Sequence, residues 1–128
     1  MKKILLFFLF SSVVILNACK KESEEEHDAA YYTASANCNT VVDSLNTFTL
    51  SVKAIMESNC AVTGCHNAIT KADGTDFSDY ATAKDEFLNA EALCTINHDC
   101  EAMPKGGAKL SDAVIAQLTC WVKNGCKE

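Results

Sequence analysis

Two closely spaced cysteines and a histidine mark the stretch Cys60-Ala61-Val62-Thr63-Gly64-Cys65-His66. In the related pattern Cys-x-x-Cys-His, the two thiols form thioethers with the vinyl groups of a c-type haem, and the histidine binds the iron. Four residues separate the cysteines here instead of two, so the motif is a lengthened variant. It predicts that Cys60, Cys65 and His66 bind a single covalent haem.

A second ligand for the iron is available downstream, in the stretch Met103-Pro104-Lys105-Gly106-Gly107. The thioether of Met103 is a soft ligand, and paired His and Met ligands raise the reduction potential of haem iron. His98 is the alternative distal ligand and would give two histidine ligands. With both axial positions filled, no open position remains for a substrate. We therefore expect electron transfer and not an enzyme.

The N-terminus predicts export. Lys2 and Lys3 precede an apolar run over residues 4–16, which is typical of a secretory signal peptide. The run ends at a sequence that resembles a bacterial lipoprotein box, so we expect residues 1–18 to be cleaved and Cys19 to be lipidated. The alternative is an ordinary signal peptide cut near Ala18. A lipid-anchored protein outside the cytoplasm is expected, at the outer membrane on its periplasmic side or at the cell surface.

Residues 19–38 are expected to be an acidic, disordered tether, because such dense charge with few apolar residues cannot form a core. Loss of Lys2 and Lys3 with the leader changes the formal net charge from −6 to −8. The chain has no arginine and no basic stripe, which disfavours nucleic-acid binding. An acidic surface favours redox partner proteins with a basic docking surface.

Residues 39–128 are expected to form one small all-α domain. Apolar residues recur at helical spacing over 47–58 and again over 79–92, and no stretch alternates convincingly as a strand. A third helix is expected to begin after Ser111, a good N-cap, and to stop near Gly125. Its apolar face would include Trp121.

Cysteine pairing is expected to stabilise this small domain. With Cys60 and Cys65 assigned to haem, five further cysteines remain beyond Cys19, an odd number that cannot all pair. Local disulfides between Cys94 and Cys100 and between Cys120 and Cys126 are plausible. A bond from Cys38 to the C-terminal helix is equally reasonable, and the sequence does not choose between them.

Together these motifs resemble a small class I cytochrome c domain, and in particular the single-haem lipoprotein cytochromes of Bacteroidota. The resembling segments are 54–67, 74–84 and 96–125. The resemblance implies a helical fold around one covalently attached haem c, with the first and last helices packed together. It also implies thioethers at Cys60 and Cys65, with His66 and Met103 as axial ligands.

Two other classes of protein compete with this interpretation. In the first, Cys60 and Cys65 form disulfides, and the chain is a haem-free, disulfide-stabilised lipoprotein that acts as a binding or interaction module. In the second, Cys60, Cys65, His66 and a ligand such as His98 bind zinc. Adjacent Cys65 and His66 rarely point at one tetrahedral ion, which weakens the zinc alternative.

Overall fold

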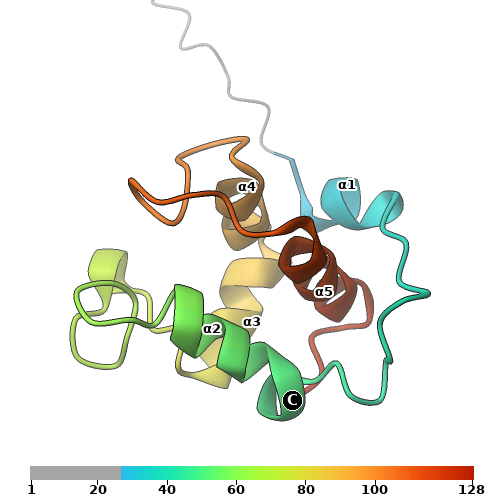
Figure 1. The fold of residues 1–128 in the computed structure, drawn as a ribbon, viewed down its shortest axis with the longest axis horizontal. Coiled ribbons are helices and arrows are strands. Elements are labelled where there is room, and N and C mark those ends of the chain that lie inside the picture. Colours follow the sequence, from blue (N-terminus) through green and yellow to red (C-terminus); the bar gives the residue numbers. More distant parts are fainter. Residues whose placement is uncertain (1–26) are drawn as a thin grey trace, which may run out of the picture.

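The computed structural model describes residues 27–128, and within this range the chain forms helices and no strands, which confirms the predicted all-α class (Figure 1). The predicted cleavage site, the predicted lipidation site Cys19 and most of the charged run lie outside the described residues. The elements, in chain order, are α1 (Ala29–Ala34), the π-helix η1 (Phe48–Val52), α2 (Lys53–Asn59), the 3-10 helix η2 (Ala72–Gly74), α3 (Tyr80–Leu88), α4 (Glu91–Asn97) and α5 (Asp112–Lys123).

Helix α5 has the boundaries that the sequence predicts. The side chain of Ser111 accepts a hydrogen bond from the amide of Val114, as an N-cap does, and Asp112 stands in the positive first turn. Gly125 follows the C-cap with a φ of 84°, a left-handed conformation that glycine adopts without steric cost. These local signals fix the helix before any tertiary contact is considered.

Trp121 of α5 lies at the centre of the core. Its ring centroid is 6.1 Å from that of Phe48 in η1 and 5.7 Å from that of Phe87 in α3. Its Nε1 donates a hydrogen bond to the carbonyl of Lys127, so the buried polar atom is satisfied. The helical stretch 48–59 and the last helix therefore meet through aromatic side chains.

The predicted middle helix is two helices. Helix α3 ends at Leu88, and α4 begins at Glu91 after Ala90 has turned into the left-handed region with a φ of 71°. The side chain of Asn89 accepts a hydrogen bond from the amide of Glu91, which supports the new start. The prediction of one continuous helix over 79–92 is wrong, because the spacing of apolar residues carries no information about this reversal of the backbone at Ala90.

Residues 29–37 are not a disordered tether, contrary to the prediction. They include α1, which packs against α5 (Figure 1). A disulfide between Cys38 and Cys120, with a Cα–Cα distance of 5.6 Å, fixes this segment to α5. The ammonium group of Lys123 also donates a hydrogen bond to the carbonyl of Ala36. These tertiary ties order a segment whose own composition gives little tendency to fold.

Cys38 pairs with Cys120 of the C-terminal helix, which settles the alternative that the sequence left open, and the other alternative, a bond between Cys120 and Cys126, does not form. Cys126 is a buried free thiol. Its amide donates a hydrogen bond to the carbonyl of Trp121, and burial raises the pKa of its thiol to about 11. The second predicted local disulfide, between Cys94 and Cys100, is confirmed, with a Cα–Cα distance of 5.6 Å.

None of the helices in residues 27–128 is both long enough and apolar enough to span a bilayer.

Candidate functional site

The stretch Cys60–His66 forms a closed loop at the end of α2. Cys60 is the C-cap of that helix, and its amide donates to the carbonyl of Met56 at 2.8 Å. The amide of His66 returns to the carbonyl of Cys60 at 3.1 Å, which closes the loop. Gly64 has a φ of 87°, which other residues adopt only with strain. The spacing of the motif thus brings both cysteines and the histidine together.

Both cysteines of this loop are free thiols, although four other cysteines form two disulfides. Cys65 is exposed and Cys60 is partly buried. Burial, and then the neighbouring Cys65, raises the pKa of the Cys60 thiol to about 11. Cys60 is therefore protonated at neutral pH, unlike the low-pKa thiolates that act as nucleophiles in cysteine enzymes.

The ring of His66 is held mainly by packing. Its centroid lies 5.3 Å from that of Phe77, edge to face, and the amide of Phe77 donates to the His66 carbonyl at 2.9 Å. The Nδ1 atom of His66 is buried and has no hydrogen-bond partner among the described residues. A buried polar atom without a partner costs about 1–3 kcal/mol. This atom is not the Nε2 that is predicted to bind iron, so its burial does not by itself indicate a ligand.

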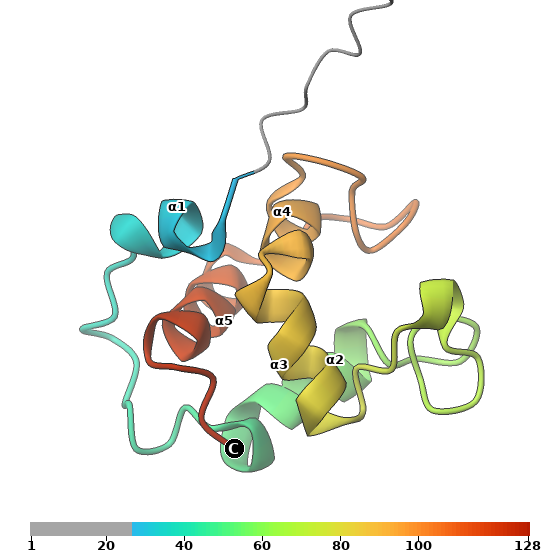
Figure 2. The same cartoon turned by 180° about the vertical axis from the view of Figure 1, so that it is seen from behind.

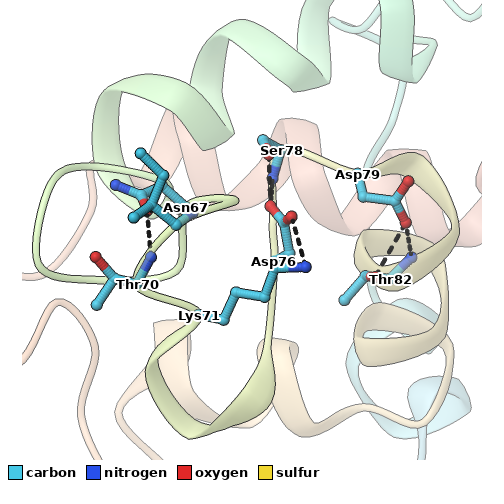
Figure 3. A network of polar contacts seen from close by, with 8 residues as sticks. Asn67, Thr70, Lys71, Asp76, Ser78, Asp79 and Thr82 are labelled. Atoms are coloured by element: carbon cyan, nitrogen blue, oxygen red, sulfur yellow. Dashed lines mark hydrogen bonds and ion pairs between the residues drawn. The ribbon is translucent and has the colours of Figure 1, made fainter.

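A polar network fixes the chain behind this loop (Figure 3). The buried carboxylate of Asp76 accepts hydrogen bonds from the hydroxyl and the amide of Ser78, and Lys71 lies 3.6 Å away. On the loop itself, the side chain of Asn67 accepts from the amide of Thr70 at 2.8 Å. The network therefore braces the segment between His66 and α3.

Asp76 should make the stability of the protein depend on pH. The Ser78 hydroxyl, and with smaller effect the Ser78 amide and Lys71, lowers the pKa of Asp76. A carboxyl whose pKa is lowered by folding stabilises the protein above its unfolded pKa of about 3.9, and this contribution is lost as pH falls through the folded pKa. Asp76→Asn is thus expected to destabilise the protein at pH 7, and the difference from the original chain should shrink below about pH 4.

Urea unfolding at pH 7 and pH 3 measures this difference. The matched control is Asp85→Asn, because Asp85 is exposed on α3. The prediction would be contradicted if the free energies of unfolding of Asp76→Asn and the original chain differed by the same amount at both pH values.

Met103 and His98 lie together in a second loop. The amide of Met103 donates to the carbonyl of Thr95 at 3.1 Å. Nε2 of His98 lies 3.2 Å from the carbonyl oxygen of Met103, so this nitrogen donates to the oxygen. His98 thus uses on the protein backbone a nitrogen that could otherwise bind a metal, which favours Met103 over His98 as the distal ligand.

The two loops extend from the same side of the helices. In both views, the segment 60–75 (yellow-green) and the segment 99–110 (orange) project beyond α2 and α4 in the same direction (Figures 1 and 2). No hydrogen bond joins His66 to Met103 within the described part of the chain. The structure therefore forms two groups, Cys60 with Cys65 and His66, and His98 with Met103, on one side of the molecule.

One sequence expectation must be corrected. Nowhere in residues 27–128 do three or more His, Cys, Asp or Glu residues gather as a metal-binding group. The prediction that the chain is metal-binding, with His66 and Met103 or His98 as ligands of an iron ion, is contradicted for these residues, and the same finding speaks against the zinc alternative. Disulfides, the other expected role of the cysteines, are present instead.

Asp76 and Ser78 were not recognised from the sequence as part of the site. The spacing Asp-x-Ser is a common turn signal, in which the aspartate side chain accepts from the backbone two residues ahead. That signal could have indicated the turn, but not its burial behind His66.

Comparison of the chain with protein-family models, with curated proteins and with solved structures yields no match.

Proposed function

We propose that this chain is a membrane-tethered electron carrier that holds one haem c through thioethers to Cys60 and Cys65. The observation that carries this proposal is the state of the Cys60–His66 loop. Its two cysteines are free thiols while four others are paired, and the hydrogen bond from the His66 amide to the Cys60 carbonyl places His66 on the same closed loop. Free thiols at the two cysteines of the motif support this proposal because a thioether requires them.

The ligands that this chain offers, His66 and Met103, fit the needs of a haem. Haem supplies its own four nitrogen ligands to iron, together with a one-electron redox centre, and asks the protein for two axial ligands. Two axial ligands are fewer than the three-residue cluster that a bare metal ion would need, so the proposal does not require a metal site made of side chains. His66 and Met103 lie on loops that extend from the same side of the fold.

Each residue then has a distinct task. Cys60 and Cys65 fix the group covalently, which keeps it in place without a deep pocket. His66, backed by the ring of Phe77, supplies a nitrogen donor whose orientation is set by packing. Met103 supplies a neutral sulfur that favours the reduced iron. With both axial positions taken, the protein exchanges electrons and has no position for a substrate.

The proposed location of the carrier rests on the N-terminal sequence. A lipid on Cys19 would hold it at a membrane outside the cytoplasm, with the acidic residues that follow as a spacer. The formal net charge of −8 after loss of Lys2 and Lys3 with the leader favours association with a redox partner that has a basic docking surface.

The deciding experiment is a visible spectrum together with an intact mass, on full-length protein made in a host that matures Cys-x4-Cys-His sites. Sharp bands in the reduced spectrum and an added mass of one haem that survives denaturation are expected. A colourless protein with the mass of the polypeptide would overturn the proposal.

The role of Met103 can be tested by a matched pair of substitutions. Met103→Leu is expected to lower the reduction potential by on the order of 100 mV, since 59 mV corresponds to a tenfold change in the relative stabilities of the two oxidation states. It should also open the iron to added imidazole. Met56→Leu is the control, because Met56 is buried in the core and the change conserves volume. Equal potentials in the two variants would contradict the assignment of Met103.

A haem-free interaction module is the second candidate, and the two disulfides favour it because they stabilise the small domain without any cofactor. Val42 and Leu45 are 61% and 58% exposed, at a hollow between residues 40–51 and α5. Apolar side chains at such a hollow are typical of a contact surface. The same mass measurement separates this candidate from the electron carrier.

A further inference from the structure

We infer that the Cys94–Cys100 disulfide and His98 form a clamp that positions Met103 for the iron, an inference that rests on the proposed function. In this role Cys94, Cys100 and His98 do not touch the haem. They act on Met103, and therefore on how firmly the second axial position is held.

The first part of the clamp is the short covalent loop at the end of α4. The disulfide joins residues separated by six positions, with a Cα–Cα distance of 5.6 Å. Within it, the amide of Asp99 donates to the carbonyl of Cys94 at 3.1 Å, and the amide of His98 donates to the carbonyl of Thr95 at 3.2 Å. The chain is thereby reversed within a few residues.

His98 adopts a conformation that needs this support. Its φ is 65°, in the left-handed region that residues other than glycine adopt only at a cost. Such a conformation persists where the surrounding structure over-determines it, and here the disulfide and the two backbone hydrogen bonds do so. This conformation directs the imidazole toward the Met103 carbonyl.

The second part of the clamp holds Met103 at its backbone. Its amide donates to the Thr95 carbonyl at 3.1 Å, and its carbonyl accepts from Nε2 of His98 at 3.2 Å. Both polar groups of Met103 are thus bound to the last turn of α4 and its cap. Around it the loop is mostly exposed, including Glu101, Ala102 and 105–109. The contacts with α4 therefore restrain a segment that has little packing of its own.

The two disulfides should differ in what they control. Cys38–Cys120 spans 82 positions and joins the N-terminal segment to α5, whereas Cys94–Cys100 closes the turn that leads into the Met103 loop. A long closed loop restrains the unfolded chain more than a short one does, so this disulfide contributes more to global stability. Cys94–Cys100 contributes less to global stability and acts on the Met103 loop.

The experiment compares two double variants of the full chain with haem attached, Cys94→Ser/Cys100→Ser and Cys38→Ser/Cys120→Ser. The readouts are the charge-transfer band of methionine sulfur on ferric iron and the affinity for added imidazole. A released Met103 occupies the iron less of the time, so the first variant should lose band intensity and bind imidazole about tenfold more tightly. The second variant should match the original chain in both, although it is less stable.

A second comparison, between His98→Ala and His98→Gln, covers the case in which the Cys94→Ser/Cys100→Ser protein does not fold. The amide of glutamine can still donate to the Met103 carbonyl. His98→Gln should therefore retain more of the intensity of the methionine charge-transfer band than His98→Ala. In haem-free protein, the amide of Met103 should exchange faster with solvent in His98→Ala.

Either of two results would overturn the clamp. The first is an unchanged imidazole affinity in both the Cys94→Ser/Cys100→Ser and the His98→Ala proteins. The second is an equal increase in imidazole affinity in the two double cysteine variants. Absence of covalent haem from the original chain would overturn the proposed function and the clamp together. Haem attachment without a change in these readouts would overturn the clamp alone.

Discussion

Replacing both Cys60 and Cys65 with alanine is expected to give a colourless protein with the mass of the polypeptide alone. The two thiols are the proposed attachment points, and a thioether cannot form without them. Both are free and lie on the loop that also carries His66. Cys65 is exposed and Cys60 is only partly buried at the edge of the core, so the helical far-ultraviolet spectrum should be retained.

The buried thiol of Cys126 provides the control for this experiment. Cys126→Ala removes a free cysteine that lies beside Trp121 and far from the motif in sequence, so haem attachment should be unaffected. Covalent haem in the protein that lacks Cys60 and Cys65 would show that other cysteines attach the group. Loss of haem in Cys126→Ala, with the fold intact, would show that attachment does not depend on the motif alone.

Local signals predicted the elements that depend on local chemistry. Ser111 and Gly125 bound α5 because capping and the left-handed C′ position act within one turn of the chain. The helical spacing of residues 47–58 predicted the continuous stretch of η1 and α2 for the same reason. The short separation made Cys94–Cys100 plausible but did not single it out, because Cys120 and Cys126 have the same separation and do not pair.

Features that depend on distant residues could not be predicted in this way. The pairing of Cys38 with Cys120 depends on where α1 lies against α5, and the sequence left it as one of two alternatives. The reversal at Ala90 interrupts a spacing that otherwise continues into α4. Order in residues 29–37 comes from tertiary contacts that composition does not report.

In the candidate site, too, local sequence predicted some features, while others depend on contacts that only the folded chain shows. The motif identifies Cys60, Cys65 and His66 because they are neighbours in sequence. The hydrogen bond that engages His98 with the carbonyl of Met103 becomes visible only in the folded chain. The contact changes the interpretation of His98 from a competing ligand to a residue that holds Met103 in place.

Trp121→Ala is expected to destabilise the protein by about 3–5 kcal/mol, the usual cost of truncating a large buried aromatic residue. The side chain is fully buried between Phe48 and Phe87, and its Nε1 satisfies the carbonyl of Lys127. Its removal leaves a cavity where η1, α3 and α5 meet. It also removes one of the two hydrogen bonds that the Lys127 carbonyl accepts, the other being donated by the Phe48 amide. Urea unfolding followed by circular dichroism measures the loss.

Trp121→Phe separates packing from the hydrogen bond. It keeps an aromatic ring against Phe48 and Phe87 but cannot donate to Lys127, so it should cost less than Trp121→Ala. Leu50→Ala is the surface control, since Leu50 is 64% exposed, and should change stability by less than about 0.5 kcal/mol. If Trp121→Ala cost no more than this control, the aromatic cluster would not join the three helices. The Cys60–His66 loop follows directly from α2, so the packing of Trp121 against η1 also sets where the proposed haem ligand lies.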